Sequence, residues 1–233
     1  MRYFILFLSF FTSIFFNVST DLNVFNLSEK DKEIYLTFDD GPSTNVTSEI
    51  LDILKEEDVK GTFFIVGKEI NGREDILKRI YEEGHSLGLH SFTHERNNLY
   101  NDNNKFLKEM LTTQELIYKT VGIKPTALRF PFGCNNNTYK LKESLVDLLH
   151  KNNLKIYDWN VDSKDGEFYN ANESLFIKNS KSKKDSIILL MHCGTANKNS
   201  PKALKEIIKY YKDNNYKFKT INSDTKELYH YIK

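Results

Sequence analysis

Short apolar runs of strand length alternate along this chain with longer segments whose apolar residues recur every three or four positions. This alternation is typical of a parallel sheet covered by helices, because two parallel strands need a long crossover between them. We expect about seven βα units in a single α/β domain, arranged as a parallel sheet or barrel. The expected strands are residues 34–38, 61–66, 86–89, 127–130, 155–161, 186–191 and 216–221.

The size and charge of the chain limit what it does. At 233 residues, of which 39% are hydrophobic, it has material for one core. Lys+Arg 33 against Asp+Glu 32 give a formal net charge of +1, which indicates no nucleic-acid partner. The local lysine-rich run at 178–184 is typical of a solvated loop. No feature bears on the oligomeric state.

The N-terminus resembles an export signal. Residues 3–18 are almost wholly apolar behind Met1 and Arg2, as in a secretory signal peptide. We therefore expect an exported protein with a signal peptide or membrane anchor at 1–20, a short linker at 21–30 and the folded domain at 31–233. The small-residue cleavage pattern is weak, so an uncleaved anchor remains the alternative.

The first expected strand runs into two neighbouring acids. Residues 37–42 read TFDDGP, so Asp39 and Asp40 stand where a buried strand turns into a loop. In βα barrels the loops after the strands lie on one face and carry the chemistry. A solvated acidic turn is the alternative for this stretch taken alone.

Two histidines follow the third expected strand. His90 and His94 are four residues apart, a spacing that on a helical turn faces both rings the same way. With one carboxylate from residues 39 and 40 they would form a set of two histidines and one aspartate that binds a divalent metal and leaves positions open. Without those acids, two surface histidines at this spacing by chance would be the better interpretation.

The later strand ends add further polar groups. Arg129 stands at the end of the fourth expected strand and could hold a carboxylate by a bidentate contact, or make an ordinary surface ion pair. Asp162 and Asp165 follow the fifth strand. His192 follows the sixth, where a proton-transfer role is favoured over that of a core histidine.

Five of these segments, in this order and spacing, resemble the motifs of the polysaccharide deacetylases with a NodB homology domain, carbohydrate esterase family four. The resemblance spans about residues 34–221. It implies a distorted (β/α)7 barrel that hydrolyses an N-acetyl group on a glycan at one divalent metal ion, most often zinc, with cobalt as the alternative. The matching segments are residues 37–42, 90–94, 129–133, 159–165 and 190–192.

The resemblance also implies roles for individual residues. The metal ligands would be Asp40, His90 and His94, and the general base would be Asp39, oriented by Arg129. The remaining roles concern the leaving amine, the oxyanion and the acetyl group. His192 would protonate the leaving amine, and Asp165 would hold its imidazole. The backbone N–H of Phe132 would stabilise the oxyanion. Leu190 and Trp159 would line the acetate pocket.

Two positions depart from the family pattern. Gly166 stands where many members have a tryptophan, so we expect a missing wall and a wider or differently shaped groove. Cys193 stands where an acid often follows the motif histidine, and Cys134 lies just past the arginine motif. In an exported protein a disulfide between these two cysteines is favoured over free thiols or a thiolate on the metal.

The leading interpretation is an exported deacetylase that acts on N-acetylglucosamine units of peptidoglycan. Chitin oligomers and acetylated xylan are alternative substrates for the same chemistry. A catalytically silent glycan-binding protein that retains the metal is a second interpretation, and an amidase for a non-carbohydrate substrate is a third.

Overall fold

The computed structural model describes residues 31–137 and 139–229. The expected signal peptide or anchor at 1–20 and the linker at 21–30 lie outside the described residues. No helix within the described ranges is both long enough and apolar enough to cross a membrane.

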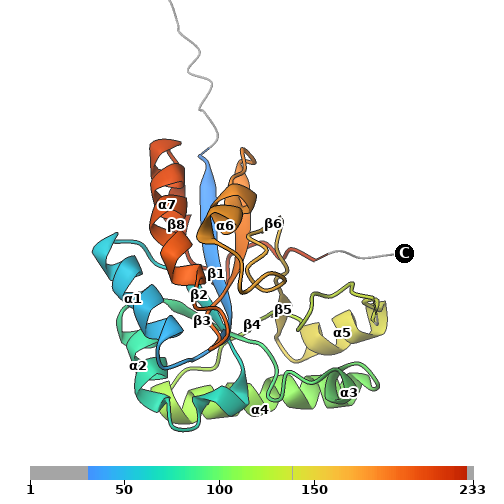
Figure 1. Ribbon diagram of the computed structural model, residues 1–233. Coiled ribbons are helices and arrows are strands. Elements are labelled where there is room, and N and C mark those ends of the chain that lie inside the picture. The colour runs from blue at the N-terminus through green and yellow to red at the C-terminus, as the bar shows by residue number, and fades with distance from the viewer. Residues whose placement is uncertain (1–30, 138, 230–233) are drawn as a thin grey trace, which may run out of the picture.

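A parallel sheet of eight strands forms the centre of the domain (Figure 1). The strand order is β5-β4-β3-β2-β1-β7-β6, and β8 pairs with the first half of β1. The strands are β1 (Glu33–Gly41), β2 (Thr62–Ile65), β3 (Ser86–Leu89), β4 (Ala127–Leu128), β5 (Lys155–Ile156), β6 (Val161–Asp162), β7 (Ser186–His192) and β8 (Lys217–Lys219).

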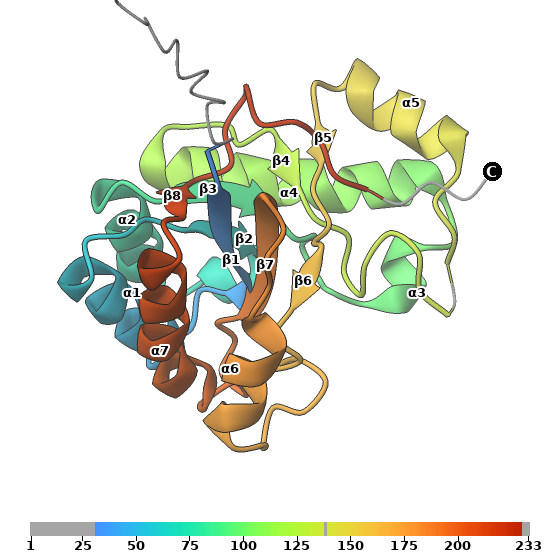
Figure 2. The same cartoon turned by 90° about the horizontal axis from the view of Figure 1, so that it is seen from above.

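The sheet curls but does not close, as Figure 2 shows from above. The strand expected at 155–161 is two strands, β5 and β6, which form the two ends of the sheet. Between β5 and β6, the backbone at Asp158 bonds to a segment outside the eight strands. Asp158 N donates to Leu228 O, so the segment around Leu228 lies at the opening between the two ends of the sheet. The parallel α/β architecture is confirmed, and the expected seven-stranded barrel is an open, curled half-barrel.

Helices cover the outer face of this sheet (Figures 1 and 2). The longest is α4, whose N-cap Asp102 accepts a hydrogen bond from Lys105 N at 2.9 Å and whose C-cap Gly122 has the left-handed conformation typical of that position. The helices are α1 (Val46–Glu56), the 3₁₀ helix η1 (Gly67–Ile70), α2 (Glu74–Glu82), α3 (Arg96–Leu99), α4 (Asn103–Val121), α5 (Glu143–Lys151), α6 (Glu173–Ser180) and α7 (Ser200–Asp213).

The alternation of side chains along β1 separates the core from the site. Leu36 and Phe38 belong to the large apolar cluster that the helices bury, whereas Tyr35 belongs to a smaller cluster on the opposite face. Thr37 and Asp39, on the same side as Tyr35, are almost completely buried. The strand therefore carries a carboxylate to its C-terminal end on the concave face of the sheet.

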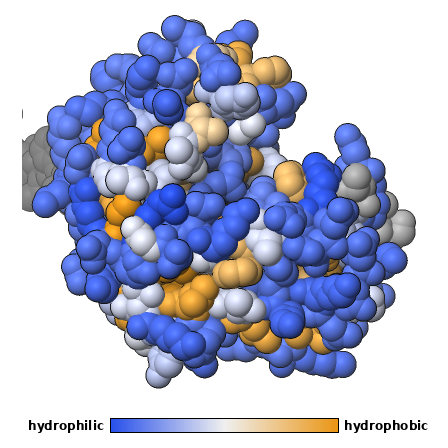
Figure 3. Space-filling view, turned by 60° about the horizontal axis from the view of Figure 1, so that its bottom comes forward, coloured by the Kyte–Doolittle hydropathy of each residue, from blue (hydrophilic) through white to orange (hydrophobic). Residues whose placement is uncertain are grey.

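The face of the molecule in Figure 3 is mostly hydrophilic, with apolar side chains gathered in small areas. Exposed apolar side chains in small areas are normal on the surface of a globular domain.

Candidate metal centre and catalytic site

A β-bulge at the end of β1 turns two consecutive acids toward one site. Asp39 pairs with Phe64 and Gly41 with Ile65, so Asp40 is the extra residue, and its φ of 70° is left-handed. In a regular strand neighbouring side chains point to opposite faces. The bulge lets the carboxylates of both Asp39 and Asp40 line the same cavity.

Asp40, His90 and His94 form a cluster that fits a metal ion. Each offers one ligand atom, and these atoms all lie within 4.8 Å of one another. Asp40 Oδ1 lies 3.5 Å from His90 Nε2 and 3.3 Å from His94 Nε2. This buried oxygen accepts no hydrogen bond from the described residues. A buried carboxylate oxygen facing two imidazoles needs a cation, and one oxygen with two nitrogens is a donor set that suits zinc.

The tautomer of His90 suits a metal ligand. Its Nδ1 lies 3.0 Å from the carbonyl oxygen of Arg129, which only accepts hydrogen bonds, so Nδ1 carries the proton. Burial, with a further contribution from His94, lowers the pKa of His90 to about 3. The ring is therefore neutral near pH 7, with the lone pair of Nε2 directed at the cluster.

The helical turn expected between the two histidines is wrong. Residues 91–94 form an irregular loop in which Ser91 and His94 have left-handed φ values of 67° and 57°. His94 N donates to Ser91 Oγ at 2.9 Å. The ring centroids of His90 and His94 still lie only 5.0 Å apart, so the pairing is correct although its local structure is not.

Arg129 holds the neighbouring acid. Its guanidinium is completely buried, and Nη1 donates to Asp39 Oδ1 at 2.9 Å and to Thr37 Oγ1 at 2.7 Å. The expected bidentate contact does not form, because Nε and Nη2 donate to the carbonyl oxygens of Tyr157 and Asp158. Burial raises the pKa of Asp39, and Arg129 opposes that rise. The carboxylate of Asp39 is thus fixed beside the cluster of Asp40, His90 and His94.

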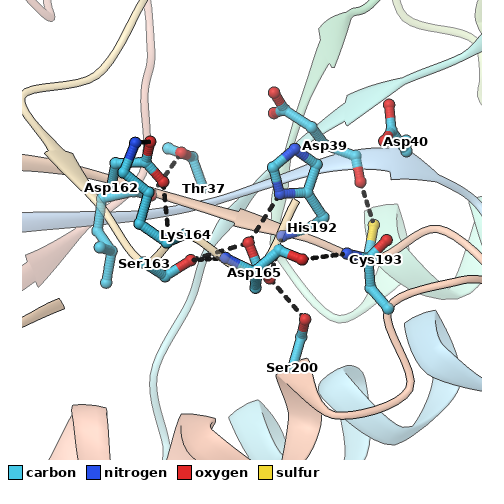
Figure 4. A network of polar contacts seen from close by, with 12 residues as sticks. Thr37, Asp39, Asp40, Asp162, Ser163, Lys164, Asp165, His192, Cys193 and Ser200 are labelled. Carbon is cyan, nitrogen blue, oxygen red and sulfur yellow. Dashed lines mark hydrogen bonds and ion pairs between the residues drawn. The ribbon is translucent and has the colours of Figure 1, made fainter. Parts of the chain in front are cut away.

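His192 and Asp165 form a hydrogen-bonded pair beside the cluster (Figure 4). His192 Nδ1 lies 2.8 Å from Asp165 Oδ1, and the backbone N–H of His192 donates to Oδ2 at 2.9 Å. Ser163 and Ser200 also donate to this carboxylate, at 2.8 and 2.5 Å. Burial lowers the pKa of His192, but the charge of Asp165 outweighs it and raises the pKa to about 10. The imidazole therefore holds a proton at neutral pH.

The two acids at the end of β1 and the three histidines open onto one cavity of about 390 Å³, whereas Arg129 and Asp165 lie behind its wall. The predicted lining residues Leu190 and Trp159 are part of its wall, and so is Phe132, whose side chain is 40% exposed. The ring of Phe132 lies between His94, at a centroid distance of 4.8 Å, and the guanidinium of Arg96, at 3.9 Å. A larger cavity of about 760 Å³ contains none of the predicted site residues.

Gly166 lies directly against the imidazole of His192. A Cβ atom at this position would lie 2.4 Å from Cε1 of His192, so the imidazole occupies the space that a side chain would need. Glu167 and Tyr169 line the cavity on this side. Gly166 therefore packs closely against the histidine, and the wider or differently shaped groove stays a prediction.

The expected disulfide is wrong. Neither Cys134 nor Cys193 is part of a disulfide, and both side chains are buried. The thiol of Cys193 is directed at the backbone of β1, where Sγ lies 3.2 Å from the carbonyl oxygen of Asp39. Burial raises the pKa of Cys193, so it is a protonated thiol and not a metal-binding thiolate.

Sequence reasoning missed several supporting residues. Thr37 binds Arg129, and Ser163, Ser200 and Asn197 surround Asp165. Thr37 and Ser163 lie inside the motifs, so their position in the sequence could have indicated that they belong to the site. Ser200 and Asn197 come after the last motif, and only the fold brings them to the site.

Comparison with known proteins agrees with this geometry. Residues 26–148, more than half of the chain, match the family model of polysaccharide deacetylases. A peptidoglycan-N-acetylglucosamine deacetylase of Bacillus cereus is 33% identical over 86% of this chain and 73% of its own length. The corresponding enzyme PgdA of Listeria monocytogenes is 33% identical over 87% of this chain and 40% of its own length.

A solved structure extends the match to three dimensions. The polysaccharide deacetylase Bc1974 from Bacillus cereus superimposes with a TM-score of 0.76 at 33% identity, covering 84% of this chain and 94% of that one. Sequence family and fold lead to the same assignment: the chain belongs to the polysaccharide deacetylase family.

Proposed function

We propose that this protein is a metal-dependent hydrolase that removes acetyl groups from N-acetylglucosamine residues of peptidoglycan. Two relatives that match most of the chain carry this activity in their names. The observation that carries the proposal is the buried Asp40 Oδ1, which faces two imidazoles and has no hydrogen bond from the described residues. Asp39 and His192, the proposed base and acid, line the same cavity.

Asp40, His90 and His94 would hold the metal ion, with zinc as our first choice and cobalt as the second. When bound, the ion would polarise the acetyl carbonyl and lower the pKa of the attacking water. Asp39 accepts the proton of that water, and Arg129 keeps its carboxylate in place at 2.9 Å.

His192 supplies the proton that the leaving amine takes up. Its ring lines the cavity and is protonated through its contact with Asp165, so it donates to the nitrogen of the departing amine. Trp159 and Leu190 would receive the acetyl methyl group, and the backbone N–H of Phe132 would stabilise the oxyanion. Base and acid are thus separate groups, which lets one take a proton while the other gives one.

Competing functions differ from this one in substrate or in catalytic competence. Chitin oligomers and acetylated xylan would undergo the same chemistry in the same cavity. A silent glycan-binding protein is disfavoured because Asp39, His192 and the metal cluster are all in place.

The test is acetate release from purified peptidoglycan and from N-acetylglucosamine oligomers, with metal-stripped protein before and after addition of zinc or cobalt. We expect acetate only with metal, and the preferred polymer identifies the substrate. Asp39→Asn should retain metal binding and lose activity, because an amide takes up no proton. Asp224→Asn, an exposed change elsewhere, is the control. Tight metal binding without acetate release from any substrate would favour a glycan-binding protein.

We also propose that the chain is exported, on the strength of the apolar segment at residues 3–18. Mass spectrometry of the protein recovered from outside the producing cell would give its first residue. Recovery only from the cytoplasm would contradict export.

A further inference from the structure

We propose that Glu109, on α4, is a positioning residue that fixes the loop between His90 and His94 and thereby sets the affinity of the metal centre. The inference rests on the metal dependence proposed above. Glu109 lies 15 residues beyond His94, outside every motif used in the sequence analysis, and it does not line the cavity.

The loop that joins the two histidines needs external support. Ser91 and His94 are both non-glycine residues in the left-handed conformation, with φ values of 67° and 57°. L-residues other than glycine adopt this region at a cost in free energy. A loop of this shape persists only where surrounding groups hold it.

Glu109 supplies that support through a single oxygen. Oε2 accepts hydrogen bonds from the backbone N–H of Phe92 at 3.0 Å, from the backbone N–H of Thr93 at 2.7 Å and from the hydroxyl of Thr93 at 3.0 Å. The side chain is half-buried, which strengthens hydrogen bonds to an ionised acceptor. The carboxylate therefore clamps the two residues midway between the ligands.

Other groups hold the carbonyl side of the same loop. Thr113 Oγ1 donates to Ser91 O at 2.7 Å, Gly67 N donates to the same oxygen at 2.9 Å, and Lys68 N donates to Phe92 O at 3.0 Å. These contacts anchor the start of the loop. The N–H groups that precede His94 are directed at Glu109, so its loss should release His94 more than His90.

The fixed position of His94 matters for binding. His90 is buried and held by its bond to Arg129 O, whereas the side chain of His94 is 25% exposed. A ligand that must be ordered when the metal arrives costs affinity. Removing outer groups that orient metal ligands typically weakens binding about 10–100-fold. We expect Glu109→Ala to raise the dissociation constant for zinc by about tenfold or more.

The experiment compares Glu109→Ala and Glu109→Gln with the wild type. Zinc dissociation constants are measured on metal-stripped protein by competition with a chromogenic chelator, and the visible absorption spectrum of the cobalt-loaded protein reports the ligand set. Glutamine keeps an acceptor oxygen but loses the charge, so it should bind zinc with an intermediate constant and restore part of the cobalt spectrum. A merely structural role would lower thermal stability without changing that spectrum.

Glu115→Ala is the matched control. It lies on the same helix, and its exposed side chain pairs only weakly with Lys119 and Lys124 at 3.9 and 3.7 Å. It should leave zinc affinity and the cobalt spectrum unchanged.

Wild-type zinc affinity and an unchanged cobalt spectrum in both Glu109 variants would overturn the inference. If Glu109→Ala does not fold, Glu109→Gln alone decides it by the same two measurements. Failure of the wild type itself to bind zinc or cobalt would instead contradict the proposed function, and with it this inference.

Discussion

Asp165 is completely buried, and its Oδ1 lies 2.8 Å from His192 Nδ1. Three further donors reach the same carboxylate: the hydroxyls of Ser163 and Ser200 and the backbone N–H of His192. A carboxylate with four donors stays ionised in a buried site. The protonated state of His192 is therefore a property of the fold around Asp165.

Replacing Asp165 by asparagine should remove the acid function of His192. The amide has the same shape but no charge, so the pKa of His192 falls and the imidazolium is lost at neutral pH. We expect kcat for acetate release to fall about 10²–10⁴-fold, with the zinc dissociation constant unchanged. His192→Gln should lower kcat by a similar factor, whereas the exposed control Asp224→Asn should leave kcat unchanged. Near-normal kcat in Asp165→Asn would exclude the proposed role of His192.

The same pair makes unfolding depend on pH. The pKa of His192 rises from 6.5 to about 10 on folding, so its contribution to stability is complete below pH 6.5 and is lost as the pH rises toward 10. The pKa of Asp165 is lowered from 3.8, so its contribution is present above pH 3.8 and lost in acid. The difference in unfolding free energy between metal-free wild type and Asp165→Asn should be largest between pH 3.8 and pH 6.5.

Urea unfolding of both proteins across this range measures that difference. The expected result is a difference that shrinks steadily above pH 6.5, toward the raised pKa of His192. A difference of constant size from acid to alkaline pH would show that the pair does not titrate as proposed.

Arg129→Met should destabilise the fold and not only the site. Arg129 neutralises Asp39 and donates to two backbone carbonyls in a fully buried position. Removing one partner of a buried ion pair costs about 3–5 kcal/mol. Arg79→Met, whose guanidinium is 30% exposed and pairs with Asp52 and Glu83, should cost about 1 kcal/mol or less. Equal losses in the two variants, measured by urea unfolding, would contradict this account of the buried pair.

Much of this site follows from residue pattern alone, because strand ends are where an α/β sheet gathers polar groups. The pattern predicted His90 and His94 with one carboxylate from residues 39 and 40, and the family resemblance singled out Asp40. The structure brings the ligand atoms of Asp40, His90 and His94 within 4.8 Å of one another. The helical turn between the histidines was wrong because tertiary contacts from Glu109 and Thr113 override the local spacing rule.

The single strand expected at 155–161 and the disulfide were wrong for related reasons. The run at 155–161 has strand-like composition, but the backbone of Asp158 bonds to Leu228, which is far away in sequence. Both cysteines follow strand ends, as predicted, but sequence gives no direction for a side chain. The thiol of Cys193 is directed at β1 and not at Cys134.

Thiol titration separates the two accounts of the cysteines. Denatured, unreduced protein should give two free thiols, one each from Cys134 and Cys193. The native protein should react slowly, because both side chains are completely buried and burial raises the pKa of Cys193. Absence of free thiols after denaturation without reductant would restore the disulfide and contradict the structure.

Gly166→Ala tests the packing between Gly166 and His192. The added Cβ would lie 2.4 Å from Cε1 of the imidazole, closer than real Cβ contacts, so the ring must move. Movement lengthens the 2.8 Å contact between His192 and Asp165 and misplaces the proton donor. We expect kcat to fall about tenfold or more, because a displaced proton-transfer group loses much of its contribution.

The measurement is acetate release from peptidoglycan together with zinc titration of the same protein. Zinc affinity should stay at the wild-type value, since His192 is not one of the three proposed ligands. Glu167→Ala, at the neighbouring position on the same cavity wall, controls for a change in groove shape, because its side chain is 58% exposed and pairs with Lys164. If Gly166→Ala keeps full activity, the ring has room to move, and the glycine is not needed for the placement of His192.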